Sequence, residues 1–262
     1  CRYDLDDRQN SNLSPGPDIK GMRRVPLLSL KARRREPEWM DQPGLEAGLH
    51  QDALAALRRV NRISGTARWL WRPIHRLAGE GASRPLRILD LASGGGDVAV
   101  GLALEARRAG VTVEIDGCDI SPLAVTLAQA QACGAGLTQL RFFKHDVVRD
   151  ELPRDYDIVT CSLFLHHLDE ADAVRVMRKM ALSAKRLVLI DDLRRSPLGY
   201  ALAWTGCRML TRSPVAHTDG PRSVRAAFTL DEVARLADQA GLASFRLSRH
   251  WPQRFLLSWS NL

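Results

Sequence analysis

A glycine-rich turn flanked by acidic residues is the feature of this sequence that could most directly carry chemistry. Residues Leu86 to Leu91 read as a short β-strand, and Ala92-Ser93-Gly94-Gly95-Gly96-Asp97 follows before an apolar helix start at Val98. Glycine lets a ligand approach the backbone closely, and the first turn of a helix offers N–H groups without partners. The pattern predicts a binding site for a small ligand; a turn with a purely structural role is the alternative.

Polar side chains also follow the next three predicted strands. Asp119 ends the second strand, at the distance from the glycine turn where a carboxylate binds ribose hydroxyl groups in nucleotide-binding folds. Asp146 and Val147 follow the third strand, and Cys161 and Ser162 end the fourth. Because ligands of open parallel sheets bind at the carboxyl ends of the strands, we expect these residues to converge on one crevice.

The elements that must position these residues alternate in kind after Gly81, with short β-branched runs between helical stretches. The predicted strands are Leu86–Leu91, Val111–Cys118, Leu140–Lys144, Asp157–Cys161 and Arg186–Ile190, followed by a terminal antiparallel pair, Phe245–His250 and Arg254–Trp259. A helix at Leu230–Ala240, closed by Gly241, precedes that pair. This alternation is typical of βαβ units, so we predict an α/β fold with a parallel sheet and helices on both faces.

Local composition divides the chain into three parts. Residues 1–33 are polar and then basic, so we expect a disordered tail, and the part before Met22 could be a non-native extension. Residues 34–82 have a helical pattern with a break at Ser64-Gly65, which predicts an N-terminal helical cap. Residues 83–262 form the predicted core.

A cap insert is predicted within the core, at about residues 194–228. It includes the apolar segment Leu198–Leu210, which reads either as a core helix or as a lid over a hydrophobic ligand that could also contact a membrane surface. No run of the sequence approaches the roughly 18 apolar residues of a membrane span.

The overall composition is that of a globular protein, with 262 residues of which 45% are hydrophobic and 26% charged. A formal net charge of +8 permits attraction to phosphates, but no aromatic residues are interleaved with the basic ones as a nucleic-acid surface would require. The five cysteines include no CxxC pair. We therefore expect reduced thiols and neither disulfides nor a zinc–cysteine site. Reduced thiols are typical of a cytoplasmic protein, and we predict that location.

Together, the strand-end residues resemble the cofactor site of class I S-adenosylmethionine-dependent methyltransferases, in particular the ubiquinone/menaquinone-biosynthesis type, over about residues 85–245. The resemblance implies S-adenosyl-L-methionine as cofactor. It also implies a Rossmann-like, doubly wound, mostly parallel seven-stranded sheet that ends in an antiparallel hairpin, here with an N-terminal helical lid.

The resemblance also implies a role for each matching residue. It assigns Asp90, Ala92, Ser93, Gly94 and Gly96 to the methionine end of the cofactor, Asp119 to the ribose, Ile120 to the adenine face, Asp146 and Val147 to the adenine edge, and Cys161 and Ser162 to the sulfonium side. Ala92 departs from the family, which usually has the first glycine of the turn there. A positive φ at this position would weaken cofactor binding or reshape the turn.

Two other functions are alternatives. An NAD-dependent oxidoreductase shares the strand, the glycine turn and the distal acid, but its G-x-G-x-x-G spacing differs from the contiguous Gly94-Gly95-Gly96 and from Ala99. A non-catalytic S-adenosylmethionine-binding subunit is supported by Ala92, whereas the presence of both Asp119 and Asp146 argues against it.

The residues after the fourth strand bear on the methyl acceptor. Nucleic-acid and amide N-methyltransferases of related fold carry Asn/Asp-Pro-Pro-aromatic there, whereas this chain has Cys161-Ser162-Leu163-Phe164. We therefore expect O- or C-methylation of a small hydrophobic phenolic, polyketide or quinone-type molecule and no nucleic-acid partner. The oligomeric state is left open.

A hydroxyl acceptor must lose a proton, and three histidines are candidate bases: His166, His167 and His217. For the adjacent pair the alternative role is to order the pocket, and for His217 it is a loop in which Asp219 accepts backbone hydrogen bonds. Asp191-Asp192 resembles a magnesium site, but no third ligand is evident in the sequence, so we expect no metal.

Overall fold

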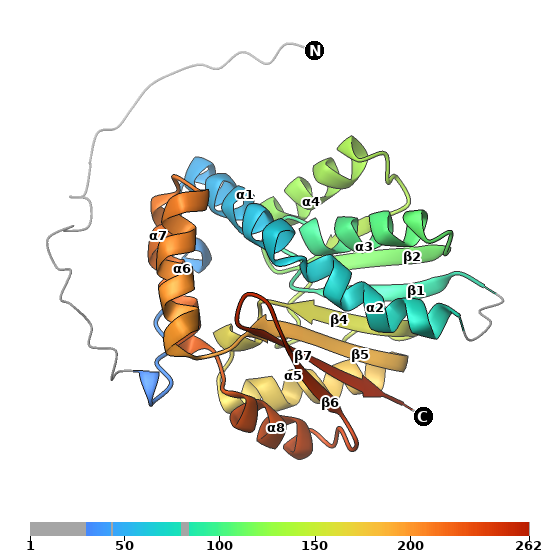
Figure 1. The fold of residues 1–262 in the computed structure, drawn as a ribbon. Coiled ribbons are helices and arrows are strands. Elements are labelled where there is room, and N and C mark those ends of the chain that lie inside the picture. The colour runs from blue at the N-terminus through green and yellow to red at the C-terminus, as the bar shows by residue number, and fades with distance from the viewer. Residues whose placement is uncertain (1–29, 43, 80–83, 262) are drawn as a thin grey trace, which may run out of the picture.

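The centre of the computed structural model, which describes residues 30–42, 44–79 and 84–261, is a seven-stranded sheet (Figure 1). The strands are β1 (Leu86–Leu91), β2 (Val113–Asp119), β3 (Arg141–Lys144), β4 (Tyr156–Ser162), β5 (Ala184–Leu193), β6 (Arg246–His250) and β7 (Arg254–Ser260). Their order is β3-β2-β1-β4-β5-β7-β6, with β7 antiparallel to both β5 and β6 and the other pairs parallel. The predicted fold class is confirmed.

The strand boundaries follow the predicted ones closely, apart from β5. Its carboxyl end extends through Asp191 and Asp192, because both residues pair with β7 in the antiparallel ladder. This pairing buries two carboxylates inside the sheet, where their side chains need charged partners.

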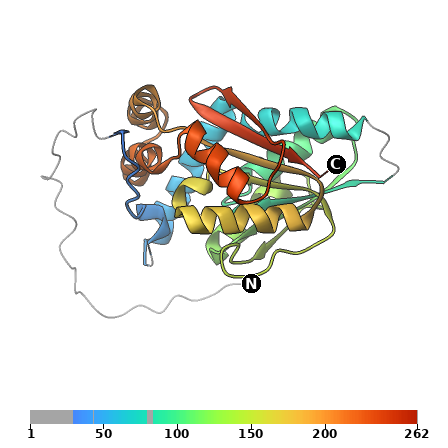
Figure 2. The same cartoon turned by 90° about the horizontal axis from the view of Figure 1, so that it is seen from below.

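Helices cover both faces of the sheet. The flanking helices are α2 (Thr66–Ala78), α3 (Asp97–Arg108), α4 (Pro122–Gly134), α5 (Glu170–Ser183) and α8 (Leu230–Gln239). One core joins the sheet to α5 and α8, and a second core joins it to α2, α3 and α4. Figure 2 views the molecule from the side of α5 and α8.

A separate group of helices lies beyond one end of the sheet. It consists of α1 (Ala47–Ser64), α6 (Pro197–Leu210), α7 (Pro214–Ala226) and the short 3-10 helix η2 (Trp39–Asp41). Helix α6 contacts α7, and α1 contacts both (Figures 1 and 2). Because α6 begins four residues after β5 ends, this cap lies at the carboxyl ends of the strands.

Helix α6 is not a core helix, so that interpretation of its apolar sequence is wrong. Leu198, Trp204 and Met209 are 56%, 42% and 85% exposed, whereas Gly199 is buried. Within the described part of the chain, no helix combines the length and the apolar composition needed to cross a membrane.

Buried polar side chains attach the cap to the sheet. Arg254 of β7 donates to Asn61 Oδ1 (2.9 Å), to Thr66 Oγ1 (2.6 Å) and to Asp191 Oδ1 (3.1 Å). Asn61 also donates to Asp97 Oδ2 at 2.6 Å, at the start of α3. The junction of α1 and α2 is thereby held beside the glycine turn.

The last residues of the predicted disordered tail, 30–33, are ordered and contact the rest of the protein, so the prediction is wrong for them. Arg33 donates to the carbonyl oxygens of His166 (2.9 Å) and Leu168 (2.6 Å), and its guanidinium lies 3.7 Å from the centre of the Phe228 ring. Arg33 therefore attaches this segment to the loop after β4 and to Phe228. The rest of the predicted tail, residues 1–29, lies outside the described residues.

Candidate active site

The glycine turn after β1 has the backbone shape that its sequence suggests. Gly94 and Gly96 have positive φ angles of 52° and 78°. A Cβ on Gly96 would lie 2.8 Å from Ala128 Cβ, because the turn packs closely against α4. Both the conformation and the close approach require glycine at this position.

Ala92 also has a positive φ, of 49°, although it carries a side chain. This conformation costs a non-glycine residue about 1 kcal/mol. Ala92 therefore has the backbone conformation for which the sequence predicts weaker cofactor binding or a reshaped turn, and that conformation adds local strain. The effect on cofactor binding stays a prediction.

Replacing Ala92 with glycine is expected to raise the free energy of unfolding by up to about 1 kcal/mol, because the strain disappears. Urea denaturation measures the change. Ala109→Gly is a matched control, because Ala109 is exposed and has a φ of −86°; it should lower stability by about 0.5–1 kcal/mol. A loss of stability in Ala92→Gly equal to that of the control would contradict the prediction.

Asp119 organises the opposite side of the crevice. Its carboxylate accepts hydrogen bonds from the backbone N–H groups of Gly94 and Ser121, both at 2.9 Å. Burial raises the pKa of this carboxyl, and the two backbone hydrogen bonds oppose the increase. Asp119 therefore connects the ends of β1 and β2 directly. Next to it, Ile120 is 60% exposed, so its side chain is available to a flat ring.

The other predicted strand-end residues lie on the same edge of the sheet. Asp146 Oδ1 accepts from the N–H groups of Val148 (3.0 Å) and Arg149 (3.1 Å), which shapes the loop after β3. Val147 and Cys161 are buried, and Ser162 ends β4.

Several buried polar atoms at this edge lack a hydrogen-bond partner among the described residues. They are Asp90 Oδ2, Ser93 Oγ and Ser162 Oγ. Asp90 Oδ1 accepts from Thr160 Oγ1 at 2.8 Å, while burial raises the pKa of Asp90 to about 7. Unpartnered buried polar groups are costly, so the site suits a ligand with ammonium, carboxylate and hydroxyl groups. The residues present fit S-adenosylmethionine.

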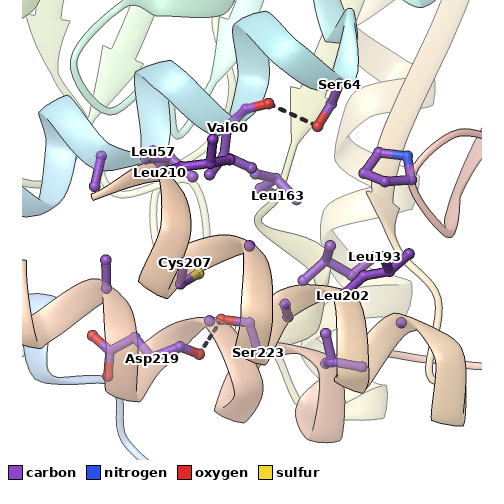
Figure 3. Close-up of a pocket in the computed structure, with 18 of the residues that line it drawn as sticks. Leu57, Val60, Ser64, Leu163, Leu193, Leu202, Cys207, Leu210, Asp219 and Ser223 are labelled. Atoms are coloured by element: carbon purple, nitrogen blue, oxygen red, sulfur yellow. Dashed lines mark hydrogen bonds between the residues drawn. The ribbon is translucent and has the colours of Figure 1, made fainter. Parts of the chain in front are cut away.

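An apolar cavity of about 380 Å³ adjoins this crevice, between α1, α6 and α7 (Figure 3). Leu57 and Val60 of α1 line it from one side and Leu202 of α6 from another. One turn earlier in α1, Leu54 covers the glycine turn: its Cδ2 lies 3.6 Å from where a Cβ on Gly94 would be. The same helix therefore borders both the crevice and the cavity.

One wall of the cavity is polar. It is formed by Glu38, His166, His167, Asp219 and Ser223, all of which line the cavity. His166 Nδ1 lies 2.7 Å from Asp192 Oδ1, and Ser223 Oγ donates to Glu38 Oε1 at 2.6 Å.

Glu38 and His166 are a charged pair in this wall. Burial opposes charge on both groups, but the interaction with His166, whose Nε2 lies 3.6 Å from Glu38 Oε1, lowers the pKa of Glu38 to about 2. The charge of Asp192, more than that of Glu38, raises the pKa of His166 to about 10. Both therefore carry charge at neutral pH, in the absence of other ligands.

The three candidate histidines differ in position. His166 and His167 face the cavity, and His167 Nδ1 lies 2.9 Å from Asp41 Oδ2. His217 lies in α7 and not in a loop; its Nε2 is 2.8 Å from the carbonyl oxygen of Thr211, and the described lining residues do not include it. The geometry thus favours the adjacent pair over His217.

Asp219 takes the alternative role that the sequence suggested. Its two carboxylate oxygens accept from the N–H groups of Trp39 (3.0 Å) and Met40 (3.1 Å). These bonds hold η2, and with it Glu38 and Asp41, against α7. Glu38 and Asp41 are not among the residues predicted from the sequence, because they precede α1 and reach this wall only through contacts with residues distant in the chain.

The Asp191-Asp192 pair also has structural partners. Asp191 binds Arg254 and lies 2.6 Å from His250 Nε2, while Asp192 supports His166.

Fold and crevice define the class of protein. Residues 88–186 match a family model described as a methyltransferase domain. With the sheet order, the glycine turn and Asp119 at the end of β2, the chain is a class I S-adenosylmethionine-dependent methyltransferase.

Curated relatives are ubiquinone biosynthesis O-methyltransferases. The protein of this name from Pseudomonas putida is 26% identical over 172 residues, which cover 63% of this chain and 71% of the relative. The one from Bordetella parapertussis is 28% identical over 159 residues, covering 60% and 61%.

Solved structures share the fold. A putative O-methyltransferase from Nostoc punctiforme has a TM-score of 0.60 at 19% identity, and the match covers 90% of this chain and 66% of that one. Magnesium protoporphyrin IX methyltransferase from Synechocystis, with bound S-adenosylhomocysteine, has a TM-score of 0.53 at 18% identity, covering 85% and 91%.

Proposed function

We propose that this protein methylates a hydroxyl group of a small hydrophobic aromatic molecule, of the phenolic, polyketide or quinone type. The observation that carries the proposal is the mostly apolar cavity beside the crevice, together with the polar wall that contains Glu38, His166 and His167. Its volume of about 380 Å³ lies in the range of small-molecule sites, and apolar walls with a few polar groups both bind and orient such ligands.

The chemistry requires orientation and loss of a proton. S-adenosylmethionine supplies an electrophilic methyl group on a sulfonium, and the acceptor oxygen must approach it in line. The apolar residues of α1 and α6 hold the ring and exclude water, and the hydroxyl group faces the polar wall. There His167 has Asp41 at its Nδ1, an arrangement that turns Nε2 toward Glu38 and the acceptor's proton.

Two further structures of similar fold support this class of acceptor. An O-methyltransferase family 2 protein from Planctomyces limnophilus was solved with apigenin (TM-score 0.53, 18% identity). An O-methyltransferase of neocarzinostatin biosynthesis was solved with 1,4-dihydroxy-2-naphthoic acid (TM-score 0.51, 19% identity). These two compounds are suitable first probes.

The test is a methylation screen with the purified protein, S-adenosylmethionine and these two phenols. We expect release of S-adenosylhomocysteine and one added methyl group by mass spectrometry. An acceptor whose hydroxyls are already methylated should be inert; if it is methylated, the reaction occurs at carbon.

The two alternative functions are tested by calorimetric titration with S-adenosylmethionine and, separately, with NAD. Binding of NAD alone would overturn the proposal, and tight binding of S-adenosylmethionine without turnover on any hydroxyl compound would favour a non-catalytic subunit. The cytoplasmic location and the membrane contact by the exposed face of α6 stay predictions.

A further inference from the structure

We propose that Glu38, His166 and His167 bind one divalent first-row transition-metal ion, for which zinc is the best match, at the polar wall of the cavity. One ligand atom from each residue lies within 4.8 Å of the other two. The site differs from the Asp191-Asp192 pair, for which the sequence shows no third ligand.

The distances suit coordination better than direct hydrogen bonds. Glu38 Oε1 lies 3.6 Å from His166 Nε2, and Glu38 Oε2 lies 3.9 Å from His167 Nε2. Hydrogen bonds of this kind are about 2.7–3.2 Å long. Ligand atoms in a tetrahedral zinc site with bonds of about 2.0–2.1 Å are about 3.3 Å apart. The three ligand atoms here lie within 4.8 Å of one another, so the side chains would move inward to close around an ion.

Both imidazoles have the support that metal-binding histidines need. A carboxylate usually accepts the Nδ1–H of such a histidine and thereby directs its Nε2 to the metal. Here Asp192 lies 2.7 Å from His166 Nδ1, and Asp41 lies 2.9 Å from His167 Nδ1. Each histidine therefore has its own carboxylate. An ion bound here would displace the Nε2 proton of His166 to solvent, because a metal ligand must be deprotonated.

The backbone around the three ligands is also held in place. Arg33 and Arg35 donate to the carbonyl oxygens of His166 and His167, at 2.9 and 3.2 Å, so these arginines leave the ring nitrogens free for other partners. Ser223 holds the Glu38 carboxylate. The arrangement therefore does not depend on an ion to bring the ligands together.

The donor set indicates the class of ion. Two imidazoles and one carboxylate form catalytic zinc sites that keep an open position, and the same set binds ferrous iron, whereas magnesium and calcium prefer oxygen ligands. All three residues line the cavity, so the open position would face the acceptor. An ion there would lower the pKa of a coordinated acceptor hydroxyl. Its O–H bond would break with the electron pair staying on oxygen, and the proton would pass to bulk water.

This role in ionising the acceptor rests on the proposed function, whereas metal binding itself does not. Without an ion, His167 Nε2 would accept the proton directly.

The experiment is a titration of the full, chelator-treated protein with Co²⁺ and with Zn²⁺. We expect one ion per chain by calorimetry, a visible cobalt absorption band, and loss of that band when zinc is added. His167→Gln should weaken binding at least tenfold, and His75→Gln, a change at an exposed histidine of α2, should have no effect.

S-adenosylhomocysteine binding shows whether each variant is folded, because the crevice residues are separate from the cluster. If His167→Gln does not fold, Asp41→Asn tests the metal site instead, because the Asp41 side chain is 55% exposed and its replacement should not disturb folding. Loss of this carboxylate should weaken metal binding about 10- to 100-fold. No binding by the wild type, or equal binding by the folded variants, would overturn the metal site. A protein that binds the ion but methylates no hydroxyl would instead overturn the proposed function.

Discussion

Replacing Asp119 with alanine is expected to weaken S-adenosylmethionine binding by two to four orders of magnitude. In the role proposed for it, the carboxylate binds two ribose hydroxyl groups. A hydrogen bond to a charged group is worth about 1.5–3 kcal/mol, and about 1.4 kcal/mol corresponds to a tenfold change in affinity. The substitution also removes the acceptor of the Gly94 and Ser121 N–H groups, so the glycine turn loses a support.

Calorimetric titration with S-adenosylhomocysteine measures the effect without an acceptor. Asp119→Asn is the matched control, since it keeps the shape and one acceptor oxygen but loses the charge; we expect an intermediate affinity. Thermal unfolding of both variants reports damage to the turn separately. If Asp119→Ala binds as tightly as the wild type, the ribose does not lie at the end of β2.

Replacing Gly206 with leucine is expected to reduce kcat/KM, for any acceptor found in the screen, to less than one hundredth of the wild-type value. Gly206 lies on the face of α6 that lines the cavity, together with Gly199, Leu202, Ala203 and Leu210. A Cβ on Gly206 would meet no atom of the described chain within 4 Å, so a larger side chain can project there without a clash. The leucine would occupy space that the acceptor needs, and helix propensity favours the change.

The cofactor site should be unaffected by this substitution, so S-adenosylhomocysteine affinity is expected to stay within twofold of the wild type. Gly134→Leu is the matched control: it lies at the end of α4, also has open space around its Cβ, and is away from the cavity. We expect normal turnover from the control. Undiminished turnover in Gly206→Leu would show that the acceptor binds elsewhere.

Much of the cofactor crevice could be predicted because its parts are local. The strand, the turn and the helix that we assign to the methionine end are contiguous from Leu86 to Arg108, and Asp119 follows at the end of the next strand. Alternating β-branched and helical segments determine a parallel sheet, and a parallel sheet brings strand ends together. The positive φ of Ala92, in contrast, could not be predicted from the sequence, because an alanine residue does not by itself indicate this conformation.

The choice among the histidines was not decided by local sequence. His217 is in a helix that continues through Pro221, and its helical phase points it at the Thr211 carbonyl, whereas Asp219 and Ser223 face the cavity. A position one or two residues away on a helix faces another direction, so an error in phase changes the assignment of every side chain.

The sequence by itself determined the class of fold, because that class depends on the periodicity of the strands and helices. Its resemblance to the methyltransferases implied the cofactor and the roles of the glycine-turn residues. Only the tertiary structure decided the acceptor cavity and its charged wall. Glu38 precedes the first long helix, His166 and His167 follow β4, and Asp192 ends β5. These residues meet because the cap packs on the strand ends, and such long-range packing depends on shape complementarity that no local pattern encodes.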